Sequence, residues 1–291
     1  MQTSTEPMQD GDWYEREYNP RLSPELDIST AWPARAAATR AKRPPVADIR
    51  TGTHPRETLD LFRAGHAKGT VVFIHGGFWR VSSKDDMSWI AEGFLDDGYS
   101  VALLNYPLCP EVSLEALIGS VRQSFAKLRA EILSEAERAA MVVTGHSAGG
   151  YLAAAFVTTD WTNFGLPVLP FDGVVAISGI FELAPLIMTT HNRTLKLDHE
   201  RAARLSLAAA RPQVDVPVTL VVGEAESSEF QRQSHALSRA WAELRTQVAV
   251  IPGANHYSIV RDLAQRGSEL NSIVLTMLAE RHGRAKRLSD S

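Results

Sequence analysis

The chain has 291 residues, of which 44% are hydrophobic and 22% charged, so it is long enough to bury a large core. Its formal net charge of -4 gives no electrostatic reason to expect nucleic acid or an anionic membrane as a partner. A single cysteine, Cys109, excludes an intramolecular disulfide and is typical of a reducing compartment. We interpret Cys109 as a small buried or loop residue, because no helix N-terminus follows it.

The first residues are polar and contain no apolar run of signal-peptide or membrane-spanning length, so we expect a cytoplasmic protein. Residues 1–45 are rich in Pro, Arg and Ala and carry scattered aromatic side chains. They predict an irregular N-terminal arm whose aromatic residues, Trp32 among them, attach it to the body of the protein, where it could lie over the mouth of the functional site. Residues 46–51 and 57–63 alternate in polarity and predict a β-hairpin.

Short apolar runs after this hairpin alternate with amphipathic helical patterns. The predicted strands cover residues 70–75, 99–104, 171–179, 216–223 and 247–252, with a further one that begins at Met141. The predicted helices cover residues 88–97, the stretch after Ser113, the stretch after Ser147, 230–244 and 257–281. This alternation predicts an α/β fold, with a mostly parallel central sheet covered by helices on both faces.

Two stretches interrupt or follow that pattern. Residues 180–213 have helical periodicity without a strand, and we interpret them as a small helical cap inserted into a domain of residues 46–281. Residues 282–291 are basic and predict a loose C-terminal tail.

The most informative motif is Gly145-His-Ser-Ala-Gly149, which follows a short apolar run and precedes the small residues Tyr151 to Val157. The pattern G-x-S-x-G is typical of a nucleophile elbow, a tight turn from a buried strand into a helix. Because glycine has no Cβ to collide with neighbouring backbone, the hydroxyl of Ser147 is exposed above the sheet. The strand and helix patterns on either side are the context that this motif requires.

A serine hydroxyl is a poor nucleophile unless a base lies within hydrogen-bond reach. Of nine histidines, His256 follows the last predicted strand in a flexible turn and is the candidate base. We interpret His235 and His191 as surface or cap residues. We interpret His146 and His75 as side chains whose hydrogen bonds fix loops.

An acid must orient that base, and in this architecture it follows the nucleophile and precedes the histidine in the chain. The strand ending at Gly223 leads into three glutamates. Glu226, three residues past the glycine, is our candidate. Glu224 and Glu229 stay open as alternatives.

The sequence His75-Gly-Gly-Phe-Trp79 follows an earlier buried strand and predicts an oxyanion loop. Two adjacent glycines allow close approach of backbone to substrate, so we expect the N–H groups of Gly77 and Phe78, together with that of Ala148, to bind the oxyanion.

The two motifs together resemble the esterase/lipase branch of the α/β-hydrolase fold, and more narrowly its kynurenine formamidase (arylformamidase) group with an H-G-G-x-W signature. Further similarity lies in Ser178-Gly-Ile-Phe-Glu-Leu-Ala-Pro-Leu186, in Asn192 and Leu197, and in residues 223–234. The resemblance covers roughly residues 70–260. One departure is that the family's catalytic aspartate falls on Glu226.

The resemblance implies hydrolysis of N-formyl-kynurenine to kynurenine and formate, with Ser147 as nucleophile, His256 as base and Glu226 as the orienting acid. It implies neither a metal nor an organic cofactor. Phe78, Trp79, Tyr106 and Tyr151 are candidates for an aromatic wall around the aryl ring. We expect a small-molecule substrate and leave open whether the protein is a homodimer.

Two alternatives remain at this stage. The same residues would serve a carboxylesterase that acts on small acyl esters, because a fold does not fix its substrate. A protein of another class, an inactive hydrolase fold used as a binding module, is disfavoured by the complete set of Ser, acid and His.

Overall fold

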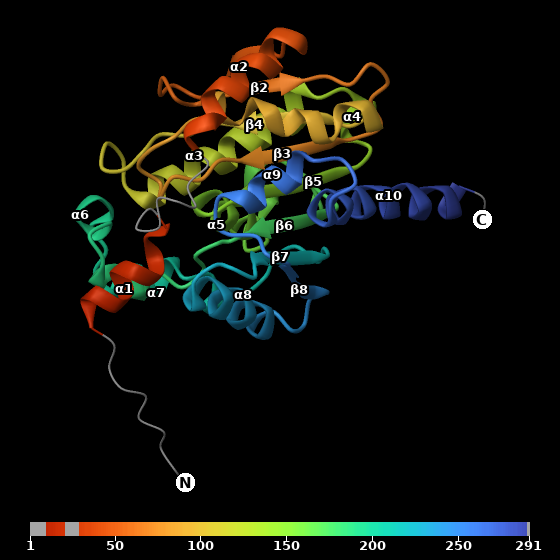
Figure 1. Cartoon of the computed structure of the whole chain (residues 1–291). Coiled ribbons are helices and arrows are strands. Elements are labelled where there is room, and N and C mark those ends of the chain that lie inside the picture. The colour runs from red at the N-terminus through yellow and green to blue at the C-terminus, as the bar shows by residue number, and fades with distance from the viewer. Residues whose placement is uncertain (1–9, 21–28, 290–291) are drawn as a thin grey trace.

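The computed structural model describes residues 10–20 and 29–289, with the side chains described up to residue 280 (Figure 1). One sheet of eight strands forms its centre, in the order β1-β2-β4-β3-β5-β6-β7-β8. The strands are β1 Val46–Arg50, β2 Thr58–Phe62, β3 Thr70–Ile74, β4 Ser100–Leu104, β5 Met141–His146, β6 Gly173–Ile177, β7 Val218–Gly223 and β8 Thr246–Ile251. β1, β2 and β4 pair antiparallel, and every other pair is parallel, which confirms a mostly parallel sheet.

Every residue of strands β2 to β7 is buried, as expected for a sheet covered on both faces. Side chains of β3 alternate between two cores: Val72 and Ile74 face one, and Val71 and Phe73 face the other. The continuous apolar runs of the sequence therefore correspond to strands that are buried on both faces of the sheet.

Helices cover both faces of this sheet, as Figure 1 shows. The α-helices are α1 Gly11–Tyr18, α2 Trp32–Lys42, α3 Leu114–Lys127, α4 Glu135–Arg138, α5 Ala148–Ala155, α6 Asn192–Leu195, α7 His199–Leu205, α8 Ser228–Ala240, α9 Ser258–Ala264 and α10 Glu269–Ser289. The helical segments that are not α-helices are the 3-10 helices η3 Ser29–Ala31, η4 Lys84–Gly93, η5 Leu95–Asp97, η7 Trp161–Phe164, η8 Ala184–Met188 and η9 Leu207–Ala209, and the π-helix η6 Leu128–Ile132. Apolar side chains of α3, α5 and α8 belong to one core, and those of α2, η4, α9 and α10 to the other.

The prediction of an irregular arm is wrong for its described part, which holds the helices α1 and α2. Asp10 caps α1 by accepting a hydrogen bond of 2.8 Å from the N–H of Trp13. The alanine-rich sequence of α2 has high helix propensity, and Pro33 fits its first turn. Residues 1–9 and 21–28 of the predicted arm lie outside the described residues.

Two other boundaries differ from the prediction. The helix expected from Ser88 begins earlier, at Lys84, because Ser83 and Asp86 form a capping box at its start. Its geometry is that of a 3-10 helix. The loose tail predicted from residue 282 is helical as far as Ser289, since its Leu, Ala, Arg and Lys residues favour a helix. Residues 290 and 291 lie outside the described part of the chain.

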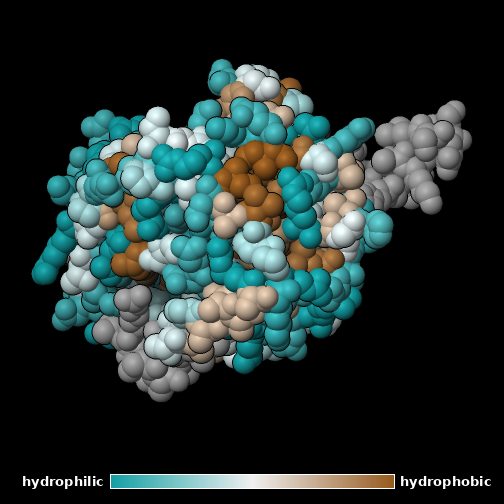
Figure 2. Space-filling model, turned by 90° about the horizontal axis from the view of Figure 1, so that it is seen from above, coloured by the Kyte–Doolittle hydropathy of each residue, from teal (hydrophilic) through white to brown (hydrophobic). Residues whose placement is uncertain are grey.

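Figure 2 shows a largely hydrophilic face with a few separate hydrophobic areas. Among the described side chains, the large hydrophobic ones that stay exposed are Val46, Val168, Leu169, Met188 and Val250. No helix in this part of the chain combines the length and apolar character that a bilayer span requires.

Candidate active site

The predicted site residues follow neighbouring parallel strands. Gly77 comes after β3, Ser147 after β5, Glu226 after β7 and His256 after β8, and Ser178, which was not among the predicted site residues, comes after β6. Parallel strands place their carboxyl ends along one edge of a sheet, where ligands of open α/β sheets bind. The sheet therefore brings together side chains that are up to 179 residues apart, from Gly77 to His256.

Ser147 occupies a strained turn between β5 and α5, with φ 57° and ψ -119°. Its N–H donates to the carbonyl of Ile177 over 2.8 Å, which ties the turn to the neighbouring strand. A Cβ at Gly145 would lie 2.3 Å from the carbonyl oxygen of Gly149, and one at Gly149 would lie 2.0 Å from that of Ile74. These contacts explain why glycine is required on both sides of the serine.

His256 and Glu226 form a buried pair. Nδ1 of His256 lies 2.7 Å from Oε2 of Glu226, so Nε2 is the ring nitrogen left for the nucleophile. The other oxygen, Oε1, accepts hydrogen bonds from the Ser178 hydroxyl over 2.5 Å and from the Gly223 N–H over 2.8 Å. The carboxylate is therefore held from two strand ends.

The two alternative acids have other partners. Glu224 is exposed and accepts a hydrogen bond of 2.9 Å from the N–H of Gly253. Glu229 binds Arg232 over 2.6 Å and accepts a hydrogen bond from the hydroxyl of Tyr18. Glu226 is thus the glutamate of this loop that meets His256.

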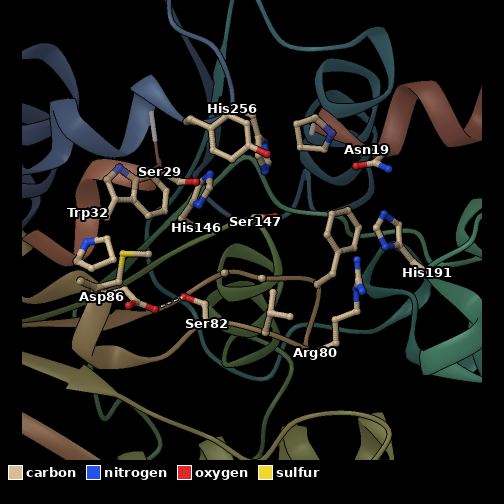
Figure 3. A pocket seen from close by; sticks show the side chains of 18 residues that line it. Asn19, Ser29, Trp32, Arg80, Ser82, Asp86, His146, Ser147, His191 and His256 are labelled. Carbon is tan, nitrogen blue, oxygen red and sulfur yellow. Dashed lines mark hydrogen bonds between the residues drawn. The ribbon is translucent and has the colours of Figure 1, made fainter. Parts of the chain in front are cut away.

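A cavity of about 270 Å³ opens at this strand edge and is lined by both Ser147 and His256 (Figure 3). Ser147 and His256 form no hydrogen bond with each other, and in serine hydrolases such contacts often tighten only in the complex with substrate. In Figure 3, Arg80 and His191 lie on one side of Ser147, and Trp32 and Asp86 lie on the other.

The oxyanion loop follows β3 and has unusual backbone geometry. Gly77, Phe78 and Trp79 all have positive φ, of 108°, 50° and 57°. A Cβ at Gly77 would lie 2.3 Å from the carbonyl oxygen of Val81. The N–H groups of Gly77 and Phe78 donate to no acceptor among the described residues, and the N–H of Ala148 begins helix α5. These N–H groups are therefore free to bind a ligand oxygen.

Two further histidines line the cavity. His146 lies with its ring centroid 4.6 Å from that of His256, and burial holds the pKa of His146 well below its usual range. His191 lies in the segment predicted as a cap, and it is buried instead of exposed, with its ring stacked on Phe78 at 3.7 Å between ring centroids.

His75 and His235 agree with their interpretation from sequence. His75 is buried and fixes its loop, because Nδ1 lies 2.8 Å from the Gly76 carbonyl and Nε2 lies 3.2 Å from Oδ1 of Asn105. Burial lowers the pKa of His75 to about 4. His235 is exposed on α8.

The predicted aromatic wall is only partly correct. Phe78 lines the cavity, but Trp79, Tyr106 and Tyr151 do not, and each is at most 1% exposed. Trp79 packs edge to face against Tyr151, whose hydroxyl donates to the carbonyl of Leu205. The hydroxyl of Tyr106 donates to the carbonyl of His75 over 2.8 Å. These three side chains support the oxyanion loop and the cap from within the core.

Several site residues were missed at the level of sequence. The arm contributes Asn19, Pro20, Trp32 and Pro33 to the cavity wall, although no periodic pattern marks them. Ser178, which holds Glu226, carried one signal: it ends a strand next to the nucleophile strand. Among the described residues, no cluster of three or more His, Cys, Asp or Glu side chains is arranged to hold a metal ion.

The sheet, the elbow and the buried acid and histidine at adjacent strand ends define an α/β-hydrolase. A family model agrees: the chain belongs to the BD-FAE family, whose model matches residues 59–240.

Individual relatives and solved structures are similar over nearly the whole chain. The kynurenine formamidase of Danio rerio is 27% identical over 92% of this chain and 97% of its own. The crystal structure of a candidate thioesterase from Silicibacter sp. tm1040 has a TM-score of 0.78 and 29% identity, and it covers 91% of this chain and 98% of its own. Esterase B from Lactobacillus rhamnosis, with an inhibitor bound, has a TM-score of 0.70 and 19% identity, covering 97% and 99%.

Proposed function

We propose that this α/β-hydrolase cleaves an aryl formamide, N-formyl-kynurenine, to kynurenine and formate. The observation that carries the proposal is the similarity to a kynurenine formamidase over 92% of the chain, together with a site in which Ser147, His256 and Glu226 follow adjacent strands. The choice of N-formyl-kynurenine as substrate follows the similarity to that kynurenine formamidase. The local geometry supports the chemistry.

In the first step, Oγ of Ser147 attacks the formyl carbon while Nε2 of His256 takes the hydroxyl proton. The carboxylate of Glu226, 2.7 Å from Nδ1, stabilises the imidazolium that forms. The N–H groups of Gly77, Phe78 and Ala148 bind the developing oxyanion, each contributing about 3 kcal/mol by comparison with similar donors.

The tetrahedral intermediate then breaks its carbon–nitrogen bond. His256 donates its proton to the departing anilide nitrogen, and Ser147 keeps the formyl group as an ester. A water molecule, deprotonated by His256, attacks this ester, which releases formate and restores the serine hydroxyl. No step requires a group outside the chain apart from substrate and water.

The test compares kcat/KM for N-formyl-kynurenine and for 4-nitrophenyl acetate on the purified protein. We expect the formamide to be the better substrate, and Ser147→Ala to abolish both activities. An ester preference of several orders of magnitude would contradict the formamidase proposal.

A carboxylesterase is the second candidate, because the structural neighbours include an esterase and a candidate thioesterase. The same comparison of substrates decides between the two. Labelling with a fluorophosphonate probe separates both from an inactive binding module: we expect Ser147 to be labelled in the folded protein and the Ser147→Ala variant not to be.

A further inference from the structure

The side chain of Arg80 places a positive charge in the cavity wall, and no acidic side chain of the described residues pairs with it. Of the described residues that line it, Arg80 is the one arginine or lysine. Its Nε is buried without a hydrogen-bond partner, and its guanidinium forms no ion pair with any described residue. A half-buried charge that lacks a partner has lost hydration without compensation, which is unfavourable unless a ligand supplies the counter-charge.

The one carboxylate among the described lining residues is already occupied. Oδ2 of Asp86 accepts hydrogen bonds of 3.1 Å from the Ser82 hydroxyl and 3.1 Å from the Ser83 N–H, which cap the start of η4. Figure 3 shows Asp86 and Arg80 on opposite sides of Ser147. Asp86 therefore leaves the charge of Arg80 available.

Arg56, in contrast, has a structural role, because its guanidinium is satisfied by hydrogen bonds within the protein. The guanidinium of Arg56 donates to the carbonyls of Tyr106 and Ser82, at 2.9 and 2.6 Å, and to Oδ1 of Asn105 at 3.1 Å. Arg56 thus fixes the segment that follows the oxyanion loop. Arg80 makes no such contact through its side chain with the described residues.

The backbone of Arg80 is fixed relative to the proposed oxyanion donors. Its N–H donates to the carbonyl of Gly77 over 3.0 Å, and the next N–H, of Val81, donates to the same carbonyl over 3.1 Å. Arg80 comes two residues after Phe78. A substrate held by these N–H groups therefore meets the guanidinium at a set position on the same loop.

We propose that Arg80 binds a carboxylate on the substrate, distant from the bond that is cleaved. The planar guanidinium offers parallel N–H donors that match the two oxygens of a carboxylate. The inference rests on the proposed function in one respect: in N-formyl-kynurenine, that group is the amino-acid carboxylate. The site thereby selects anionic over neutral substrates.

The test compares N-formyl-kynurenine with its carboxamide, which has the same shape without the negative charge. We expect the wild-type protein to prefer the acid by about ten- to a hundredfold in kcat/KM, as charged hydrogen bonds commonly contribute. In Arg80→Gln the preference falls towards one, and Arg80→Lys, which keeps the charge but not the fork, gives an intermediate ratio. Equal rates for the acid and the carboxamide in the wild-type protein would overturn the proposal.

The matched control is Arg193→Gln, an exposed arginine on the cap that does not line the cavity. The ratio of kcat/KM for the acid to that for the carboxamide should be the same in Arg193→Gln as in the wild-type protein. If Arg193→Gln lowers the ratio as much as Arg80→Gln does, the effect comes from overall charge and the Arg80 site is rejected.

A second measurement separates this inference from the formamidase proposal. With 4-nitrophenyl acetate as the substrate, 4-phenylbutanoate and 4-phenylbutanamide are compared as competitive inhibitors. Stronger inhibition by the carboxylate, lost in Arg80→Gln, supports the site even if N-formyl-kynurenine is not hydrolysed. Equal inhibition constants in the wild-type protein contradict it even if the formamide is hydrolysed.

Discussion

The carboxylate of Glu226 shows how a single side chain is positioned by its surroundings. It bridges three groups: Nδ1 of His256, the Ser178 hydroxyl and the Gly223 N–H. The family resemblance in the sequence implies aspartate at this position, and glutamate has one more methylene group, which the loop must accommodate. The three contacts indicate that this loop is fitted to the longer side chain.

We predict that Glu226→Asp lowers kcat by about ten- to a hundredfold, because shortening the side chain withdraws the carboxylate by about 1 Å, and misplacements of that size have effects of this order. KM should change little, since Glu226 contacts no substrate in the proposed mechanism. Steady-state kinetics with either substrate measures both quantities.

Glu243→Asp, the same change at an exposed position, is the control and should leave kcat unaltered. An unchanged kcat in Glu226→Asp would mean that the loop moves freely to restore the contact with His256.

At the scale of elements, a cluster of charges joins α3 to α7, a helix of the segment predicted as a cap. Glu115, in the first turn of α3, binds Arg201 over 2.8 Å and Arg204 over 2.9 Å, and both arginines belong to α7 of the cap. The hydrogen bonds from Arg201 are the main reason why the pKa of Glu115 falls to about 2. The ionised form of Glu115 therefore stabilises the folded state.

We predict that Glu115→Gln lowers the melting temperature at pH 7 by about 2 °C, the scale expected for a partly exposed ion pair. A carboxyl group whose pKa is depressed on folding stabilises the protein above its unfolded-state pKa, near 4.5. That stabilisation is lost as the pH falls towards 2. The difference from the wild-type protein should therefore shrink between pH 4.5 and pH 3, as followed by circular dichroism.

Glu131→Gln, at an exposed position on η6, should cause no comparable change. A difference for Glu115→Gln that stays constant with pH would assign the effect to packing instead of charge.

The elements of the sheet were predictable because each strand carries a local signal. The fully buried strands are apolar runs bounded by glycine or polar residues, and the site follows from their order. The elbow and the Gly-Gly loop were equally local, since nearby backbone leaves no room for a Cβ at Gly77, Gly145 or Gly149.

What could not be predicted depends on contacts between distant segments. Trp79 and Tyr151 have no sequence signal that separates core packing from substrate contact, and their burial is set by α5 and the cap. Trp32 reaches the cavity only because α2 packs against η4, so its role is visible only in the folded chain. Glu226 was the candidate acid from sequence, but only the contact with His256 in the folded chain separates it from Glu224 and Glu229.

At the scale of the whole molecule, two neutral histidines are enclosed beside the proposed catalytic machinery. Burial lowers the pKa of His75 to about 4 and holds that of His146 well below 6.5. Both side chains are free to take up a proton once the chain unfolds. Between pH 6.5 and pH 4, the unfolded state therefore binds more protons than the folded state.

We predict that the free energy of unfolding decreases as the pH falls below 6.5. For His75 alone the loss at pH 5 is on the order of 2 kcal/mol, from the linkage between protonation and folding. Urea unfolding at pH 7.5, 6 and 5 measures the trend. His75→Asn, which removes the titrating ring, should flatten it.

The variant and the wild-type protein are compared by the slope of the unfolding free energy against pH. Absolute values are not compared, because His75→Asn also loses packing against Tyr106. A stability that is constant from pH 7.5 to pH 5 in the wild-type protein would contradict the enclosure of neutral imidazoles.

The arm supplies Asn19, Pro20, Trp32 and Pro33 to the cavity, and all four precede residue 59, where the family match begins. Changes in the arm can therefore alter which molecules enter the cavity without changing Ser147, His256 or Glu226. Proteins of this family with the same sheet and elbow could therefore differ in substrate preference through substitutions in their N-terminal segment alone. A survey of substrate preference across the family should group proteins by that segment instead of by their motifs.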